Sequence, residues 1–212
     1  ELNEPLNLSV VDDQLYEGEN ALFSWDTPAD RTLRGYNFYQ DGMKINEELI
    51  TNNVYTVSGL TYNLDGYNFN VTAVWDEGES EFSNTVNVAV SGYGTVSGHV
   101  YEQDGVTGIA DATVTIIGFD EFDELVMFEF NTDANGAYSG NVLAGYFFGL
   151  AAKEGYQTVG DNTGIEVEYQ GAITDYDFIL NEEYVPVTRV VAEEIDDNQV
   201  HVYWGWDMIE DF

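Results

Sequence analysis

The sequence predicts an all-β protein made of tandem β-sandwich domains. Short runs rich in Val, Ile, Thr, Tyr and Phe alternate with Gly, Asp, Asn and Pro at close spacing, a pattern typical of antiparallel strands and turns. No segment keeps a helical periodicity over about eleven residues. With 44% hydrophobic and 15% aromatic residues, the chain of 212 residues can fill more than one small core.

Residues 1–91 are predicted to form a first sandwich of about seven strands. Turn residues such as Asp26-Thr27-Pro28, Asp41-Gly42 and Ser58-Gly59 separate its apolar runs. The predicted strands include Ala21–Trp25, Gly35–Tyr39, Val54–Val57, Tyr67–Val74 and Thr85–Val90.

Residues 95–181 are predicted to form a second sandwich, and the short linker 92–94 is expected to allow little bending. Its predicted strands are Val96–Tyr101, Ala112–Ile117 and Leu143–Leu150, with a hairpin around Asn135-Gly136. Asn and Gly tolerate a positive φ, so this pair predicts a tight turn between two paired strands.

Residues 182–212 repeat the pattern that opens the chain. Tyr184–Ala192 and Gln199–Trp204 are predicted strands on either side of a turn at 196–198. Two strands cannot bury a complete core, so we expect them to begin an incomplete further domain of a longer protein.

Residues 1–91 resemble a fibronectin type III domain, which has an immunoglobulin-like fold. Trp25 matches the tryptophan that packs between the sheets in that family, and Leu60 with Tyr67 matches its tyrosine corner with one extra residue. Asp76–Ser80 is similar to the last hairpin loop of the family. The segment 182–212 resembles the start of a second such domain.

Residues 95–181 resemble the carboxypeptidase-regulatory-like domain, a family with a transthyretin-like, or prealbumin-like, sandwich. The motifs that carry this resemblance are Thr95–Val100, Gly108–Val114, Thr132–Tyr138, Leu143–Tyr146 and Gly155-Tyr156. The resemblance implies a non-catalytic module of the kind found in secreted and surface proteins of Bacteroidetes.

The net charge of −35 disfavours two classes of partner. Forty acidic residues face five basic ones, and a polyanion of this kind repels nucleic acids and anionic lipid surfaces. We therefore expect no nucleic-acid partner and no direct membrane insertion. The chain also has no cysteine, which excludes disulfides, thiolate metal sites and a cysteine nucleophile.

No catalytic residues are predicted. The two histidines, His99 and His201, lie in different predicted domains, and the serines lack the surroundings of a nucleophile elbow. Glycines are not arranged as a phosphate-binding loop between a strand and a helix.

Two groups of residues are candidates for binding calcium, which is the one candidate cofactor. Asp120, Glu121, Asp123 and Glu124 concentrate four carboxylates between two strands, where a hard cation would relieve repulsion. Asp133 and Asn135 are similar to the start of a calcium loop. The alternatives are a solvated loop for the first group and a simple turn for the second.

Aromatic residues near strand ends are candidates for binding a glycan. Trp75, Tyr93 and Trp206 are placed where rings could form a stacking platform for a sugar. The alternative is packing in a core or between domains.

The predicted function is non-catalytic. We expect spacer, presentation and adhesion modules of a larger secreted or cell-surface bacterial protein, and no enzyme. The expected partners are other domains of the same longer chain and an extracellular glycan or protein. The alternative is a carbohydrate-binding accessory region of a secreted hydrolase.

Overall fold

The computed structural model describes residues 2–28, 32–183, 189–196 and 199–205, the last two ranges as backbone only. Within these ranges every regular element is a strand. The predicted all-β fold is therefore confirmed, and no helix in the described residues is long and apolar enough to span a membrane.

The first sandwich contains two sheets. The smaller sheet has the order β1 (Leu6–Val10), β3 (Ala21–Asp26), β6 (Val54–Val57). The larger sheet has the order β2 (Gln14–Tyr16), β9 (Val86–Ser91), β7 (Asn63–Trp75), β4 (Leu33–Gln40), β5 (Met43–Lys44), with β8 (Gly78–Glu79) paired to β7. Strand β2 runs parallel to β9, and the other pairs are antiparallel.

Aromatic rings fill the core between these sheets. Strand β3 alternates buried and exposed residues, so that Phe23 and Trp25 point inward. The Phe23 ring lies 5.0 Å from that of Phe38 and 4.6 Å from that of Phe69. Trp25 meets the Tyr36 ring edge-on at 5.1 Å. The predicted position of Trp25 between the sheets is confirmed.

The tyrosine corner forms despite its extra residue. The Tyr67 hydroxyl donates to the backbone carbonyl of Thr61 at 3.2 Å. The β7–β9 register shifts between Asn63 and Tyr67, and Gly66 lies within this shift with a φ of 82°. A bulge thus absorbs the additional residue.

The second sandwich also contains two sheets. One has the order β13 (Ala137–Leu143), β10 (Tyr93–Tyr101), β17 (Ala172–Ile173), with β18 (Phe178–Ile179) also paired to β10. The other has the order β12 (Leu125–Asn131), β11 (Thr113–Asp120), β14 (Gly145–Ala152), β15 (Val159–Gly160), with β16 (Ile165–Val167) also paired to β14. Val100, Val114, Ile116 and Phe147 are among its fully buried core residues.

The predicted hairpin around Asn135-Gly136 is wrong. Strands β12 and β13 belong to different sheets and do not pair, so the turn crosses from one sheet to the other. The Asp133 carboxylate holds it by accepting from the backbone N–H groups of Asn135 at 2.8 Å and Ala137 at 2.9 Å. Of the Asn135-Gly136 pair, only Gly136 has a positive φ, of 80°, and a Cβ added there would lie 2.7 Å from the Gly108 Cα.

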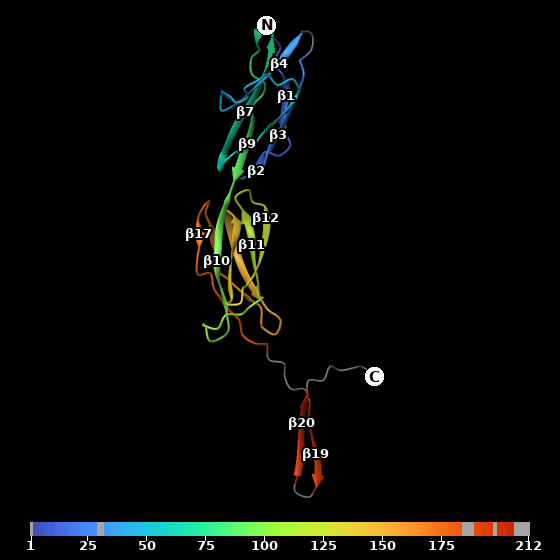
Figure 1. The fold of residues 1–212 in the computed structure, drawn as a ribbon, viewed down its shortest axis with the longest axis vertical. Helices are drawn as coiled ribbons and strands as arrows, with labels where there is room; N and C mark the ends of the chain where they lie inside the picture. Colours follow the sequence, from blue (N-terminus) through green and yellow to red (C-terminus); the bar gives the residue numbers. More distant parts are fainter. Residues whose placement is uncertain (1, 29–31, 184–188, 197–198, 206–212) are drawn as a thin grey trace, which may run out of the picture.

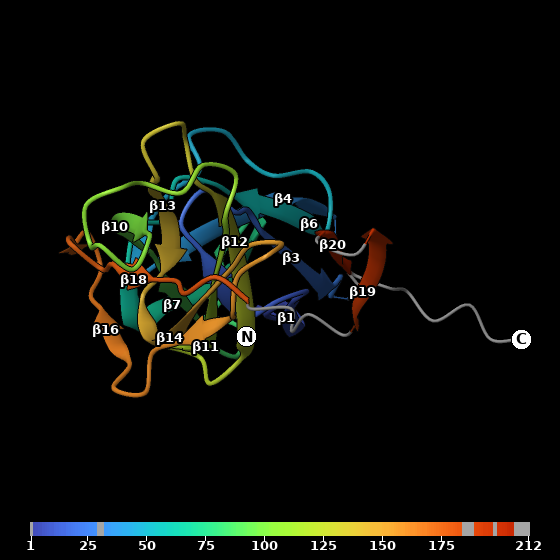
Figure 2. The same cartoon turned by 90° about the horizontal axis from the view of Figure 1, so that it is seen from below.

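The predicted linker 92–94 is shorter in the structure. Gly92 alone separates β9 from β10, because Tyr93 and Gly94 pair with Leu143 and Val142 of β13. Figure 1 shows the two sandwiches end to end with β10 continuing the direction of β9. Seen from below in Figure 2, the two sandwiches overlap in part.

The last described segment is a hairpin. Strands β19 (Arg189–Asp196) and β20 (Gln199–Gly205) pair antiparallel. The predicted strands of this region agree with them where they overlap, whereas the predicted strand residues 184–188 and turn residues 197–198 lie outside the described residues. Figure 1 places the hairpin beyond the second sandwich.

Candidate functional site

The predicted acidic loop lies at the junction between the two sandwiches. It connects β11 to β12 at the end of the second sandwich nearest the first. Asp120 is 4% exposed. Its Oδ1 accepts from the backbone N–H groups of Phe122 and Glu124, both at 2.9 Å. Asp120 Oδ1 therefore stabilises the conformation of the loop that contains it.

The other oxygen of Asp120 reaches the first sandwich. The Tyr16 hydroxyl, at the end of β2, donates to Asp120 Oδ2 at 2.5 Å. The ring of Tyr16 also lies 5.7 Å from that of Phe122. Burial and the acceptor Asp120 raise the pKa of Tyr16 well above its usual value, so the hydroxyl keeps the proton that it donates.

Glu121 binds the first sandwich through both of its oxygens. The Tyr62 hydroxyl donates to Oε1 at 2.7 Å, and the Ser91 hydroxyl donates to Oε2 at 2.8 Å. Burial and the bond to Glu121 raise the pKa of Tyr62 to about 12. Ser91 is fully buried and is the last residue of β9. The bond to Ser91 therefore holds Glu121 close to the point where the chain passes from the first sandwich to the second.

A reciprocal contact runs from the second sandwich to the first. Tyr169, which follows β16, donates to Glu17 Oε1 at 2.7 Å, and this bond raises the pKa of Tyr169. The rings of Tyr169 and Tyr62 stack at 4.2 Å with an interplanar angle of 4°. The first sandwich thus donates two tyrosine hydroxyls to carboxylates of the second, and the second donates one to a carboxylate of the first.

The backbone at Gly92 completes the junction. Its carbonyl accepts from Ala144 N–H at 2.9 Å. A Cβ at this position would lie 2.4 Å from the Tyr169 ring. Glycine is therefore required here, because the stacked tyrosine packs directly over the single connecting residue.

The structure does not gather the predicted calcium ligands into one site. Among the described residues, no group of three or more Asp, Glu or His side chains could hold a metal ion. Asp120 and Glu121 accept hydrogen bonds across the junction, and Asp133 holds a turn together with the backbone of Asn135. Asp123 and Glu124 remain in the loop, and bound calcium stays a prediction.

The predicted aromatic platform does not form around Trp75. This residue is 2% exposed and packs in the core of the first sandwich, so it cannot stack on a sugar. That prediction is wrong, because the end of β7 is covered rather than free. Tyr93 is 38% exposed at the junction, and Trp206 lies outside the described residues.

Two cavities differ in their relation to the junction. One of about 710 Å³ opens beside it, lined by Tyr62 and Tyr169, by Phe119 and Tyr146, and by carboxylates that include Asp123 and Glu166. Sequence reasoning missed this cavity, because Tyr62 and Tyr169 are 107 positions apart in the sequence and only docking of the sandwiches brings them together.

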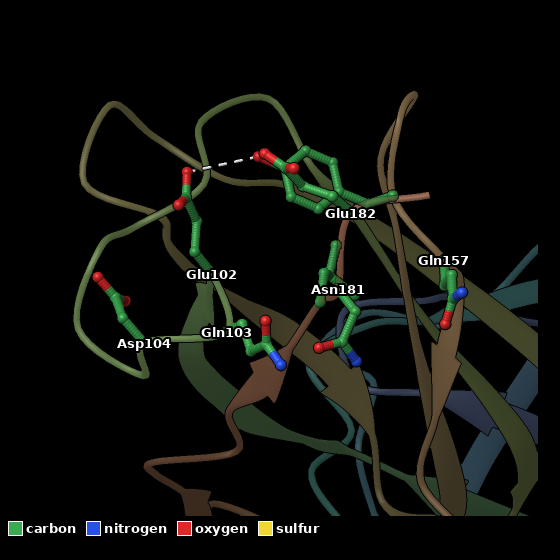
Figure 3. A pocket seen from close by; sticks show the side chains of 8 residues that line it. Glu102, Gln103, Asp104, Gln157, Asn181 and Glu182 are labelled. Carbon is green, nitrogen blue, oxygen red and sulfur yellow. Dashed lines mark hydrogen bonds between the residues drawn. The ribbon is translucent and has the colours of Figure 1, made fainter. Parts of the chain in front are cut away.

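The other cavity, of about 310 Å³, lies at the opposite end of the second sandwich, after β10. Figure 3 shows its polar lining, with Glu102, Asp104 and Glu182 beside three amide side chains. The Tyr156 hydroxyl donates to Glu102 at 3.4 Å. Its lining residues include no Lys, Arg, His or Ser, so they provide acceptors and amides rather than a nucleophile and base.

Of the two histidines, the structure describes the side chain of His99 only, and its contacts indicate a structural role. His99 stacks on Tyr101 with ring centroids 5.3 Å apart. Its Nδ1 lies 3.6 Å from Asp177 Oδ1, and the same oxygen accepts from the His99 backbone N–H. His201 belongs to β20, where only the backbone is described.

Comparisons with known proteins give remote likenesses only. No family model and no curated protein matches the chain. Fibronectin(III)-like modules of Clostridium thermocellum CbhA share 12% identity over 78% of this chain and 95% of theirs, with a TM-score of 0.35. BcpA, the major pilin subunit of Bacillus cereus, shares 14% over 84% of this chain and 71% of its own, with a TM-score of 0.37.

An enzyme is also among the similar structures. 3-Chlorocatechol 1,2-dioxygenase from Rhodococcus opacus 1CP shares 14% identity over 43% of this chain, with a TM-score of 0.36, and the match spans 60% of the length of that enzyme. Likenesses at this level carry no argument about activity.

Proposed function

We propose that this chain is a non-catalytic spacer that holds neighbouring domains of a larger secreted or cell-surface bacterial protein in a fixed orientation. The junction carries this proposal. One residue, Gly92, connects β9 to β10, and three tyrosine–carboxylate hydrogen bonds cross between the sandwiches. A connection this short and this heavily bonded restricts bending and rotation between the domains.

The bonding pattern suits a mechanical role. Tyrosine hydroxyls with raised pKa values remain donors throughout the physiological pH range. Hydrogen bonds to carboxylates are roughly twice as strong as neutral ones, and partial burial protects them from screening by salt. The orientation of the two sandwiches is therefore expected to be maintained in environments of varied ionic strength.

The alternative role in carbohydrate binding has less support. Trp75 is buried, and the rings of Tyr146 and Phe148, which are exposed, meet at 87°. Rings at this angle do not present one flat surface along which a polysaccharide could stack. The spacer role, with adhesion through other surfaces, is the function that the contacts favour.

Distance measurements between the sandwiches test the proposal. Because the chain has no cysteine, spin labels can be attached to Met43→Cys and Val106→Cys, two positions that are 72% and 79% exposed in different sandwiches. Pulsed electron resonance should give one narrow distance distribution, and adding Tyr62→Ala with Tyr169→Ala should broaden it. A broad distribution in the otherwise unchanged chain would refute the spacer role.

A further inference from the structure

An exposed apolar face covers the outer side of one sheet of the second sandwich. It is formed by outward-pointing residues of β11, β12 and β14. We call it the apolar face, and its residues are Ile117, Phe119, Leu125, Met127, Tyr146, Phe148 and Leu150. Six of them are at least 40% exposed, and Ile117 is half-buried at the centre.

The strand register makes these side chains contiguous. Phe119 lies between Leu125 and Tyr146, and Ile117 lies between Met127 and Phe148. Cross-strand neighbours on one side of a sheet are about 5 Å apart, so these two rows form one surface. Monomeric proteins rarely leave such a contiguous surface uncovered unless it binds something.

Acidic residues occur at the end of the apolar face that is nearest the first sandwich. Glu166 of β16 pairs with Tyr146, and Asp123 belongs to the loop that precedes Leu125. Phe119, Tyr146, Asp123 and Glu166 all line the cavity of about 710 Å³ beside the junction. The apolar face is therefore continuous with that cavity, which has no Lys, Arg or His in its lining.

We propose that the apolar face and the junction cavity together form a docking surface for a protein segment that carries apolar side chains followed by lysine or arginine. The apolar side chains of the partner cover the β11–β12–β14 face. Its basic group enters the cavity, where Asp123 and Glu166 supply the opposite charge. A segment of this kind removes apolar surface from water and offsets local repulsion among carboxylates.

The same charges disfavour a second copy of the chain as the occupant. In a symmetric dimer the same surface is present on both sides, so Asp123 and Glu166 of one copy would approach equivalent acids of the other. Each copy also carries a net charge of −35. The edge-on packing of Tyr146 against Phe148 likewise disfavours a flat sugar chain.

Peptide selection provides the test. A displayed library of random peptides is selected on the full chain after depletion on the double variant Met127→Ser with Phe148→Ser. We expect enrichment of sequences in which apolar residues are adjacent to Lys or Arg. Both substituted residues are exposed, at 59% and 41%, so the double variant should keep the thermal midpoint of the parent chain.

Titration of an enriched synthetic peptide then separates the two parts of the surface. Phe148→Ser should weaken binding about tenfold, as expected when one well-packed apolar anchor is lost. Glu166→Gln should weaken binding less and should reduce its dependence on salt. The matched controls are Phe82→Ser, a phenylalanine of the first sandwich that is 49% exposed, and Glu47→Gln, an exposed acid there. Neither should change the affinity.

Four results would overturn the proposal. The first is no enrichment above background, and the second is enrichment of peptides that bind the double variant equally well. The third is binding to insoluble cellulose or chitin that Phe148→Ser removes, which would assign the face to a polysaccharide. The fourth is a dimer in sedimentation that Phe148→Ser dissolves, which would assign it to a second copy. Because Asp123, Glu166 and the apolar face all belong to the second sandwich, none of these results tests whether the junction is rigid.

Discussion

The hydrogen bond between Tyr16 and Asp120 should couple the stabilities of the two sandwiches. Tyr16→Phe removes the hydroxyl that donates to Asp120 Oδ2 and leaves this oxygen without that donor on a residue that is 4% exposed. A buried acceptor that loses its partner costs about 1–3 kcal/mol. Taking about 2 kcal/mol, the docked arrangement should become roughly thirtyfold less favourable.

A double-mutant cycle isolates this bond from other effects. Asp120→Asn also perturbs the loop that Asp120 holds through Phe122 and Glu124, so its single effect exceeds the contribution of the bond. Comparing the double variant with the two single variants cancels the free-energy cost of perturbing the loop. We expect a coupling energy of about 1–2 kcal/mol, in the range for residues in direct contact.

Tryptophan fluorescence during urea unfolding provides the assay. Trp25 and Trp75 lie in the core of the first sandwich, and residues 92–181 contain no tryptophan. All variants are therefore made in a background with Trp204→Phe and Trp206→Phe, in which the signal reports the first sandwich alone. With a slope of about 2 kcal/mol per M urea, a loss of about 2 kcal/mol lowers the midpoint by about 1 M.

The control makes the same chemical change inside one sandwich. Tyr39 donates to Glu79 at 2.6 Å within the first sandwich, so Tyr39→Phe should lower its stability without coupling to Asp120→Asn. If the coupling energy between Tyr16→Phe and Asp120→Asn lies within about 0.5 kcal/mol of zero, the bond does not join the domains and the reasoning is wrong.

Three further predictions concern pH, packing and cations. The pKa of Tyr62 rises from 10.0 to about 12 in the fold, so its contribution to stability should be complete below pH 10 and lost as the pH increases toward 12; unfolding measured across this range should show less alkaline loss in Tyr62→Phe. Gly136→Ala should cost about 2–4 kcal/mol in denaturant unfolding, because its new Cβ would lie 2.5 Å from the Val100 carbonyl oxygen. Thermal midpoints should rise with NaCl on the 0.1 M scale through screening, and millimolar Ca²⁺ at matched ionic strength should add no more than Mg²⁺.

Each of these predictions has an opposing result. Equal alkaline loss in Tyr62→Phe and the parent chain would show that Tyr62 is not the group responsible. Gly155 has a similar φ of 84° but nothing within 4 Å of an added Cβ; if Gly155→Ala costs as much as Gly136→Ala, backbone strain rather than packing explains both. A midpoint that rises only with Ca²⁺, and no longer does so in Asp123→Asn, would support the calcium site of the acidic loop.

The predicted strands depended on local patterns, and most occur in the structure. Alternation in Tyr67–Val74 and in Ala112–Ile117 predicts strands because successive side chains of a strand point to opposite faces, and β7 and β11 occur there. The segment Val54–Val57 coincides with β6. The sequence predicts that Tyr67 forms a tyrosine corner. It does not predict which backbone carbonyl accepts the hydrogen bond from the Tyr67 hydroxyl, because the bulge at Gly66 depends on pairing with β9.

The turn at Asn135-Gly136 shows where local patterns fail. A turn was correctly predicted, but whether the strands on either side pair or enter different sheets depends on which distant strands they meet. Strand β12 pairs with β11, and β13 pairs with β10. The prediction that Trp75 is exposed for sugar binding is wrong for a related reason. A position at a strand end does not indicate whether other elements cover the side chain.

By itself, the sequence determined the β class, the acidic surface and the absence of cysteine chemistry, because these follow from composition and from a period of two residues. Only the tertiary structure decided what the acidic loop does. Asp120 and Glu121 look like candidate cation ligands in the sequence, yet their oxygens accept from Tyr16 and Tyr62. A carboxylate takes its role from the donors that reach it, and here those donors are brought by another domain.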